Sequence, residues 1–241
     1  MLTNLNQIRR HKNVIEDVEK ASLRMVFHAL ADFLEHAKAT FITATSRPDV
    51  TAEELLRAAL DAVGMPYVYL NLPGDVDYKK ARWVFHPEFA IKQALMVDAK
   101  AEKSETNFSI QLGQTSMRVR FMVTGRTCRK IREVGTLPKV YQGQGMSHGF
   151  LTTTIVARFN YMESDCGCTR ALTGITLAAV PNGILQGKYN RNYVHTIWQK
   201  GRDAESRGEK TRVRVSREKL IEKARWRVQD IPANGLIEWV D

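Results

Sequence analysis

The sequence predicts a mixed α/β (α+β) fold in which a mixed central sheet is flanked by helices. Apolar residues recur with helical spacing through the first 63 positions, and extended segments rich in Val, Ile, Thr and aromatic residues follow them. A further helix pattern lies near the C-terminus. No repeat and no linker rich in Pro, Gly or Ser divides the chain. We therefore expect a single domain over residues 1–241, with an N-terminal helical segment at about residues 1–63.

The helical segment is expected to contain two helices. Apolar positions between residues 14 and 42 repeat close to every third or fourth residue, which predicts one long amphipathic helix. A Ser-Arg-Pro-Asp segment then interrupts the pattern. Thr51 and Glu54 have the spacing of a capping box, which predicts the start of a second helix over residues 51–63. Gly64 should end that helix, because glycine readily adopts the left-handed conformation found after helix C-termini.

The segments that follow have the composition of strands, rich in β-branched and aromatic residues. We expect strands at residues 67–70, 81–85, 89–97, 118–123, 151–161, 174–180 and 211–215. A turn over residues 73–77 should lead into the second of these strands. A closing helix is expected over residues 216–228, with Ser216 as its N-cap.

The charge of the chain favours a polyanionic partner. Its 36 Lys and Arg residues outnumber its 26 Asp and Glu residues, which gives a net charge of +10. The excess is concentrated, because residues 118–132 contain six basic residues and no acid, and residues 188–227 contain 13 basic and five acidic residues. Such regions suit a nucleic-acid backbone, since each phosphate that is neutralised releases counterions.

Several protein classes are poorly supported. No apolar run approaches the roughly 20 residues that span a bilayer. The N-terminal residues lack the pattern of a secretory signal, so we expect a cytoplasmic protein with no membrane partner. The sequence contains no His-Glu-x-x-His motif and no paired Cys-x-x-Cys motif, which argues against a zinc enzyme.

An acid and a lysine follow the predicted strand 89–97. Asp98 and Lys100 are two residues apart, so in an extended strand their side chains would point to the same face. Asp77 lies 21 residues earlier, and two carboxylates from neighbouring strands can hold Mg²⁺ while leaving positions for water and a phosphate oxygen. Lys100 would then orient or deprotonate the attacking water and offset charge in the transition state. The pattern predicts a nuclease with Asp77, Asp98 and Lys100 as catalytic residues and Mg²⁺ held by Asp77 and Asp98.

Nearby residues leave parts of this assignment open. Asp75 could replace Asp77 as the first metal ligand, and Glu102 would share the strand face of Asp98 and Lys100. A loop of glutamines and glycines that contains His148 could probe DNA or could equally be an ordinary connection.

Polar and basic side chains near the two basic regions have the chemistry to contact DNA bases or phosphates. The candidates are Gln114, Arg118, Arg120, Asn182, Asn190 and Arg191.

The sequence around these residues resembles the SfiI-type family of type II restriction endonucleases, which belongs to the PD-(D/E)xK nuclease superfamily. The matching stretches are VDAKAEK (97–103), QLGQTSM (111–117), LTTT (151–154), PNG (181–183), KYN (188–190), the segment 208–215 and WRVQ (226–229). They cover about residues 70–230. The Pro-Asp pair of the family is interrupted here, because Pro73 and Asp77 are separated and Asp75 competes for the same role.

The resemblance implies a restriction-endonuclease-like core and a Mg²⁺-dependent endonuclease that cuts double-stranded DNA. The target would be a short palindromic site, continuous or interrupted, and the enzyme would act as a homodimer or homotetramer, because a two-fold symmetric site requires two subunits. By position, Asp77 and Asp98 would bind the metal and Lys100 would be the catalytic lysine. Two other functions stay open: a structure-directed DNA repair nuclease, and a non-catalytic DNA-binding protein in which Asp98 and Lys100 form only a salt bridge.

Overall fold

The computed structural model describes residues 8, 10–64, 81–86, 91–104, 109–111, 115–123, 128–135, 137–142, 149–167, 169–201 and 213–241. The helices within these ranges include α2 (Lys12–Asp32), α3 (Leu34–Thr43), α4 (Pro48–Ala62), α5 (Gln186–Tyr189) and α6 (Arg217–Lys223), and two 3₁₀ turns are η1 (Gly183–Leu185) and η3 (Arg225–Arg227). The strands are β1 (Ala81–His86), β2 (Ile91–Lys103), β3 (Ser109–Gln111), β4 (Val119–Val123), β5 (Arg129–Glu133), β6 (Val140–Tyr141), β7 (Phe150–Glu163), β8 (Arg170–Val180), β9 (Trp198–Lys200), β10 (Val213–Ser216) and β11 (Val228–Pro232).

The central sheet is mixed, as the sequence predicts. Among the described residues it has six strands in the order β1-β2-β7-β8-β11, with β6 paired to β7. Strands β2 and β7 run parallel, whereas β1 with β2, β7 with β8 and β8 with β11 are antiparallel. Smaller sheets are formed by β3, β10 and β9 and by the hairpin of β4 and β5.

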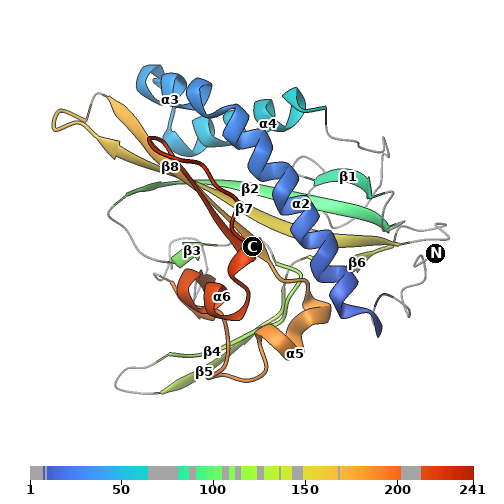
Figure 1. Cartoon of the computed structure of the whole chain (residues 1–241). Helices are drawn as coiled ribbons and strands as arrows, with labels where there is room; N and C mark the ends of the chain where they lie inside the picture. Colours follow the sequence, from blue (N-terminus) through green and yellow to red (C-terminus); the bar gives the residue numbers. More distant parts are fainter. Residues whose placement is uncertain are drawn as a thin grey trace.

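The helices of the N-terminal segment cover one face of this sheet. In Figure 1, α3 and α4 lie on one side of the sheet, and α5, α6 and the β4–β5 hairpin lie on the other. Leu30, Phe41 and Leu55 of the helices pack in one apolar cluster with alternate residues of the strands, such as Leu95 and Phe159. Burying side chains of this size stabilises a fold by about 1.5–3 kcal/mol each.

The long helix expected over residues 14–42 is two helices, so that prediction is wrong in one respect. The chain turns at Phe33, where φ is −93° and ψ is 1°, and α3 starts at the next residue. Buried positions 26, 30, 34, 37 and 41 keep helical spacing across this turn. The apolar pattern is therefore the same with or without the break, so the pattern cannot reveal that a break exists.

Helix α4 starts three residues earlier than the capping-box pattern indicates. Arg47 is extended, with φ of −60° and ψ of 143°, and Pro48 occupies the first turn of the helix. Proline is favoured there because the first helical N–H has no partner within the helix. Gly64 has a φ of +56°, which confirms the predicted end of this helix. The strand expected over residues 67–70 and the turn over 73–77 lie outside the described residues.

Strand β2 is longer than predicted and includes Asp98 and Lys100 in its interior. The expected strand ended at Val97, whereas β2 continues to Lys103. The reason is its partner, because β7 pairs with it in parallel register from Gln93 to Lys103. Backbone pairing along this whole length keeps a polar segment extended even where its side chains no longer have the apolar character of a buried strand.

The C-terminal segment also differs from the sequence prediction. Ser216 caps α6 as expected, since its hydroxyl accepts a hydrogen bond from the N–H of Lys219 at 3.3 Å. The helix ends at Lys223 instead of Val228, because Ala224 is extended. Strand β11 follows and pairs with β8. The other predicted strands are confirmed with small shifts of their ends.

A buried ion cluster joins α2 to the C-terminal segment. Arg227 and Glu19 are both fully buried, with Arg227 Nη2 at 2.6 Å from Glu19 Oε2 and Arg227 Nε at 2.8 Å from the hydroxyl of Tyr189. Burial disfavours the charge of Arg227, but Glu19 and Tyr189 outweigh it and raise its pKa. Glu16 joins the cluster by accepting hydrogen bonds from Tyr189 and from Lys188. The cluster fixes the start of α2 against α5 and η3.

The sequence predicts no membrane partner, and the lengths and compositions of the helices bear on this prediction. Among the described residues, no helix combines the length and apolar character needed to cross a membrane.

Candidate active site

Asp98 and Lys100 lie side by side on the face of β2 that points away from the N-terminal helices. Their strand neighbours Val97 and Ala99 pack in the apolar cluster with those helices, so the alternate residues project to the opposite face. Lys100 Nζ lies 2.8 Å from Asp98 Oδ2. Only 8% of the surface of Asp98 is exposed. The structure therefore brings this predicted pair into direct contact.

Glu102 shares this face, as the alternation predicts, and it forms ion pairs with two arginines. Its Oε2 atom lies 3.3 Å from Nε of Arg158, and Nη2 of Arg214 lies 3.2 Å from its Oε1. Arg158 is on β7 directly opposite Lys100 in the parallel register. Glu102 is thus held by residues from two other strands.

The donor set for a metal is described only in part. Asp75 and Asp77 lie outside the described residues. Within the described ranges no group of three His, Cys, Asp or Glu side chains is placed to hold a metal. Asp98 offers carboxylate oxygens, which are the ligands that Mg²⁺ prefers, and its neighbour Lys100 is cationic. Asp98 therefore has the chemistry of one ligand of the predicted site, whereas its predicted partner, Asp77 or Asp75, lies outside the described residues.

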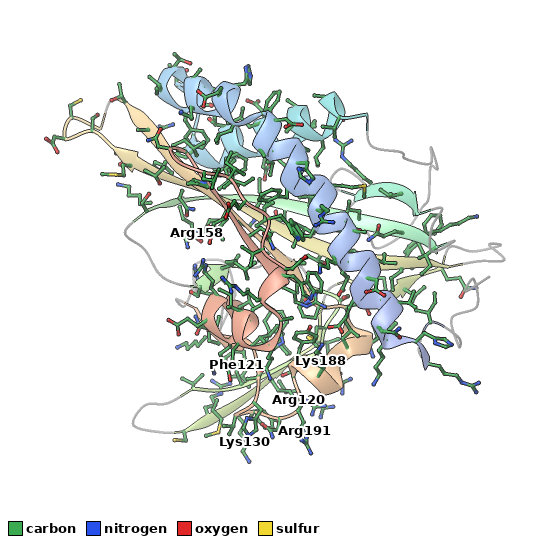
Figure 2. The ribbon with its side chains drawn as sticks, viewed as in Figure 1. Arg120, Phe121, Lys130, Arg158, Lys188 and Arg191 are labelled. Atoms are coloured by element: carbon green, nitrogen blue, oxygen red, sulfur yellow. The ribbon has the colours of Figure 1, made fainter. Side chains whose placement is uncertain are left out.

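Three predicted DNA-binding arginines lie together at another part of the molecule. Arg118 precedes β4, Arg120 lies within β4, and Arg191 is exposed in the loop after α5. Figure 2 shows Arg120 and Arg191 at the same end of the molecule, below the central sheet that bears Arg158. Gln114 and His148 lie outside the described residues.

Asn182 and Asn190 are buried instead of exposed, which corrects their assignment as DNA-contacting residues. The side-chain nitrogen of Asn182 donates at 2.7 Å to the carbonyls of Lys139 and Thr152. Asn190 donates to the carbonyl of Arg118 and accepts a hydrogen bond from Thr196. Both side chains are buried and hydrogen-bond to other segments of the chain, so they have no exposed surface with which to contact DNA.

Asn182 caps a turn, and its sequence context is typical of that role. Its Oδ1 accepts a hydrogen bond from the N–H of Ile184 at 2.9 Å and so caps η1. Asparagine before a turn commonly caps in this way. The Pro-Asn-Gly sequence could have been interpreted as a turn on that ground.

The β4–β5 hairpin carries further basic residues beside the predicted DNA-binding arginines. Arg120, Lys130 and Arg132 share one face, because Arg120 pairs with Arg132 in the β4–β5 register, and Phe121 and Ile131 point to the buried side. Lys130 and Arg132 are exposed. Lys130 also lies 5.6 Å from the ring centre of Tyr193, in the loop that contains Arg191. Strand alternation over residues 129–133 is the signal that would have found them.

Comparison with known proteins identifies the family. The family model described as type II restriction enzyme SfiI matches residues 15–231. The type II restriction enzyme SfiI of Streptomyces fimbriatus is 30% identical over 226 residues, a match that covers 90% of this chain and 84% of the relative.

Solved structures agree with this assignment. The crystal structure of tetrameric restriction endonuclease SfiI bound to cognate DNA has a TM-score of 0.78 and 28% identity, covering 93% of this chain and 86% of that one. Restriction endonuclease BglI bound to its DNA recognition sequence has a TM-score of 0.72 at 16% identity, covering 95% and 94%, which supports the fold alone. The predicted restriction-endonuclease-like fold is confirmed, and the family match includes the strand with Asp98 and Lys100. The chain therefore belongs to the SfiI family of type II restriction enzymes, which are site-specific deoxyribonucleases.

Proposed function

We propose that this restriction enzyme is Mg²⁺-dependent and hydrolyses phosphodiester bonds of double-stranded DNA at a palindromic site, continuous or interrupted. The observation that supports this most is the contact of Asp98 with Lys100, at 2.8 Å, on a strand face not covered by the N-terminal helices. Family membership supplies the reaction class. We also propose that the enzyme acts in the cytoplasm, where cellular DNA would be its substrate.

In this proposal three side chains form the catalytic centre. Asp98 would hold the metal together with Asp77, or with Asp75 if that acid is the first ligand. A bound divalent ion would polarise the phosphate and lower the pKa of a water molecule. Lys100, held beside Asp98 by the 2.8 Å contact, would orient the attacking water and offset negative charge that develops on the phosphate.

The basic face of the hairpin would bind the DNA backbone. Arg120, Lys130 and Arg132 present three positive charges on one side of two paired strands, and Arg191 adds a fourth from the neighbouring loop. Clustered cations of this kind suit phosphates, and phosphate contacts give affinity without sequence information. Arg118, which is half-buried and directly precedes β4, would complete this surface. Gln114 is proposed as a polar contact to DNA on its chemistry alone.

We propose that the enzyme acts as a homodimer or homotetramer on DNA. A palindromic site presents the same groups on both strands, so one subunit per strand is the simplest arrangement. The relative SfiI is a tetramer in its DNA complex.

Incubation of the purified protein with plasmid and phage DNA tests the proposal. Discrete fragments with Mg²⁺, and intact DNA with EDTA, are the expected result. A smear would instead support a structure-directed or non-specific nuclease. Intact DNA in the presence of Mg²⁺, together with a gel shift, would support a binding protein without catalytic activity.

A further inference from the structure

Glu102 is placed between two guanidinium groups that come from different sheets. Arg158 lies on β7 of the central sheet, and Arg214 lies on β10 of the three-stranded sheet. Their nitrogens are 3.3 Å and 3.2 Å from the carboxylate oxygens of Glu102. The side chains of all three residues are largely buried, with 17% exposure for Glu102, 8% for Arg158 and 13% for Arg214. This carboxylate therefore lies within ion-pair distance of both cations.

The two arginines need this carboxylate because they repel each other. Burial lowers the pKa of Arg158, the charges of Arg214 and Arg217 lower it further, and Glu102 is the main opposing influence. Buried charges of one sign are tolerated only where an opposite charge balances them. Removal of the Glu102 carboxylate would take away the largest favourable charge that acts on Arg158 and one ion pair of Arg214.

Glu102 places these two arginines close to the proposed catalytic residues Asp98 and Lys100. It follows Lys100 by two residues on the same face of β2, and Arg158 is opposite Lys100 in the β2–β7 register. Arg214 also donates to Ser109 on β3, through Nε to the hydroxyl at 2.6 Å and Nη2 to the carbonyl at 2.5 Å. Arg214 thus connects the β3–β10–β9 sheet to the catalytic strand at a point next to Lys100.

We infer that Glu102 is a positioning residue for DNA cleavage, which fixes Arg158 and Arg214 and thereby sets the β3–β10–β9 sheet against the catalytic strand. The inference rests on the proposed function, because it concerns the rate of the same cleavage reaction. Since misplacement of about 1 Å can cost a catalytic site roughly a hundredfold in rate, loss of this anchor should slow cutting more than it weakens DNA binding.

The test compares Glu102→Gln with wild type in single-turnover cleavage with Mg²⁺, and in DNA binding by gel shift with EDTA. Glutamine keeps the size of the side chain and removes the charge. We expect the cleavage rate to fall at least about tenfold, and the affinity to change by less than about threefold. Glu102→Asp retains the charge and should recover part of the lost rate. A smaller loss of rate for Glu102→Gln, or no recovery by Glu102→Asp, overturns the inference.

Glu163→Gln is the matched control, because Glu163 also pairs with a basic residue of β2, Lys103 at 2.5 Å, but lies at the end of β7. Its cleavage rate should stay within about threefold of wild type, and an equal loss in this variant would contradict a specific role for Glu102. If the wild-type protein does not cut DNA, the proposed function itself is refuted. Failure of the proposed function can therefore be distinguished from failure of the inference about Glu102.

A double-mutant cycle tests the connection to Arg214. If Glu102 acts by holding this arginine, the variant with both Glu102→Gln and Arg214→Met should cut no more slowly than the slower single variant. Rate losses that multiply would show that the two residues act independently, which overturns the proposed anchoring. If Glu102→Gln does not fold, as judged by circular dichroism, the Glu102→Asp and Arg214→Met variants provide the same cycle.

Discussion

Lys100 and Asp98 are the residues on which the proposed chemistry depends most closely, and they could be predicted from the sequence. Their spacing of two residues places both on one face of any strand, and that inference needed no knowledge of distant partners. The structure adds the 2.8 Å contact between them. Asn182 and Asn190 show the opposite case. The carbonyl groups to which their side chains donate lie 30, 43 and 72 residues away in the chain, so local sequence does not indicate that they are buried.

Lys100→Ala should nearly abolish cleavage while the fold is retained. The lysine is proposed to act in the transition state, so we expect a loss of at least about a hundredfold in rate, with DNA binding in EDTA preserved. Single-turnover cleavage and gel shift measure the two effects.

The matched control for this prediction is Lys103→Ala. Lys103 ends the same strand, but its side chain points to the other face and is 57% exposed. Its removal should leave cleavage within about twofold of wild type. Normal cutting by the Lys100→Ala variant would show that the catalytic assignment is wrong.

At the scale of secondary-structure elements, the β4–β5 hairpin should supply DNA affinity. Replacing Arg120, Lys130 and Arg132 together by Gln should weaken DNA binding and reduce the slope of log K against log salt by about 2–3, since each phosphate contact contributes roughly 0.9. Fluorescence anisotropy over a salt series in EDTA measures this slope.

A charge-matched control separates local contacts from net charge. Lys38, Arg47 and Arg57 lie on or beside α3 and α4, on the helical side of the sheet. Their triple replacement by Gln removes the same charge. We expect it to leave the salt slope almost unchanged, and equal slopes for the two triple variants would refute a backbone contact at the hairpin.

The junction of α2 with α5 should depend on pH through Glu16. Burial alone would raise the pKa of Glu16, but hydrogen bonds from Tyr189 and Lys188 and the charge of Arg227 outweigh it and lower the pKa below the ordinary value of 4.5. A carboxyl whose pKa is lowered by folding stabilises the folded state above its unfolded pKa, and this contribution is lost as the pH falls through the folded pKa.

Urea unfolding of wild type and Glu16→Gln measures this contribution. The wild type should be more stable at pH about 7, and the difference should shrink steadily below pH about 4.5. Glu54→Gln, on the exposed side of α4, is the surface control. A difference that stays constant or grows as the pH falls would contradict the assigned hydrogen bonds.

The elements themselves show what sequence patterns can and cannot establish. The strand over residues 151–161 can be predicted from sequence, because long runs of β-branched and apolar residues are distinctive. The break at Phe33 cannot, because the apolar spacing continues across it. The extension of β2 to Lys103 and the existence of β11 depend on pairing with β7 and β8, and such pairing is a property of the folded sheet.

For the whole molecule, we expect an assembly of two or four subunits. Analytical ultracentrifugation with and without DNA, after the mass of bound DNA is subtracted, should give a protein mass twice or four times that of the 27.4 kDa chain. The physical reason is that a symmetric DNA site needs one catalytic centre per strand. A monomer in both conditions would contradict this expectation. The Lys100→Ala variant should assemble like wild type, because that side chain is proposed to act only in catalysis.

Site-specific cleavage that depends on the Asp98 carboxylate is the central claim, and one measurement tests it most directly. Wild type and Asp98→Asn are incubated with phage DNA and Mg²⁺, and the ends of every fragment are sequenced. We predict that all wild-type ends share one two-fold symmetric sequence and that Asp98→Asn leaves the DNA intact. Ends without a common sequence, or the same fragments from both proteins at equal rates, would contradict the account.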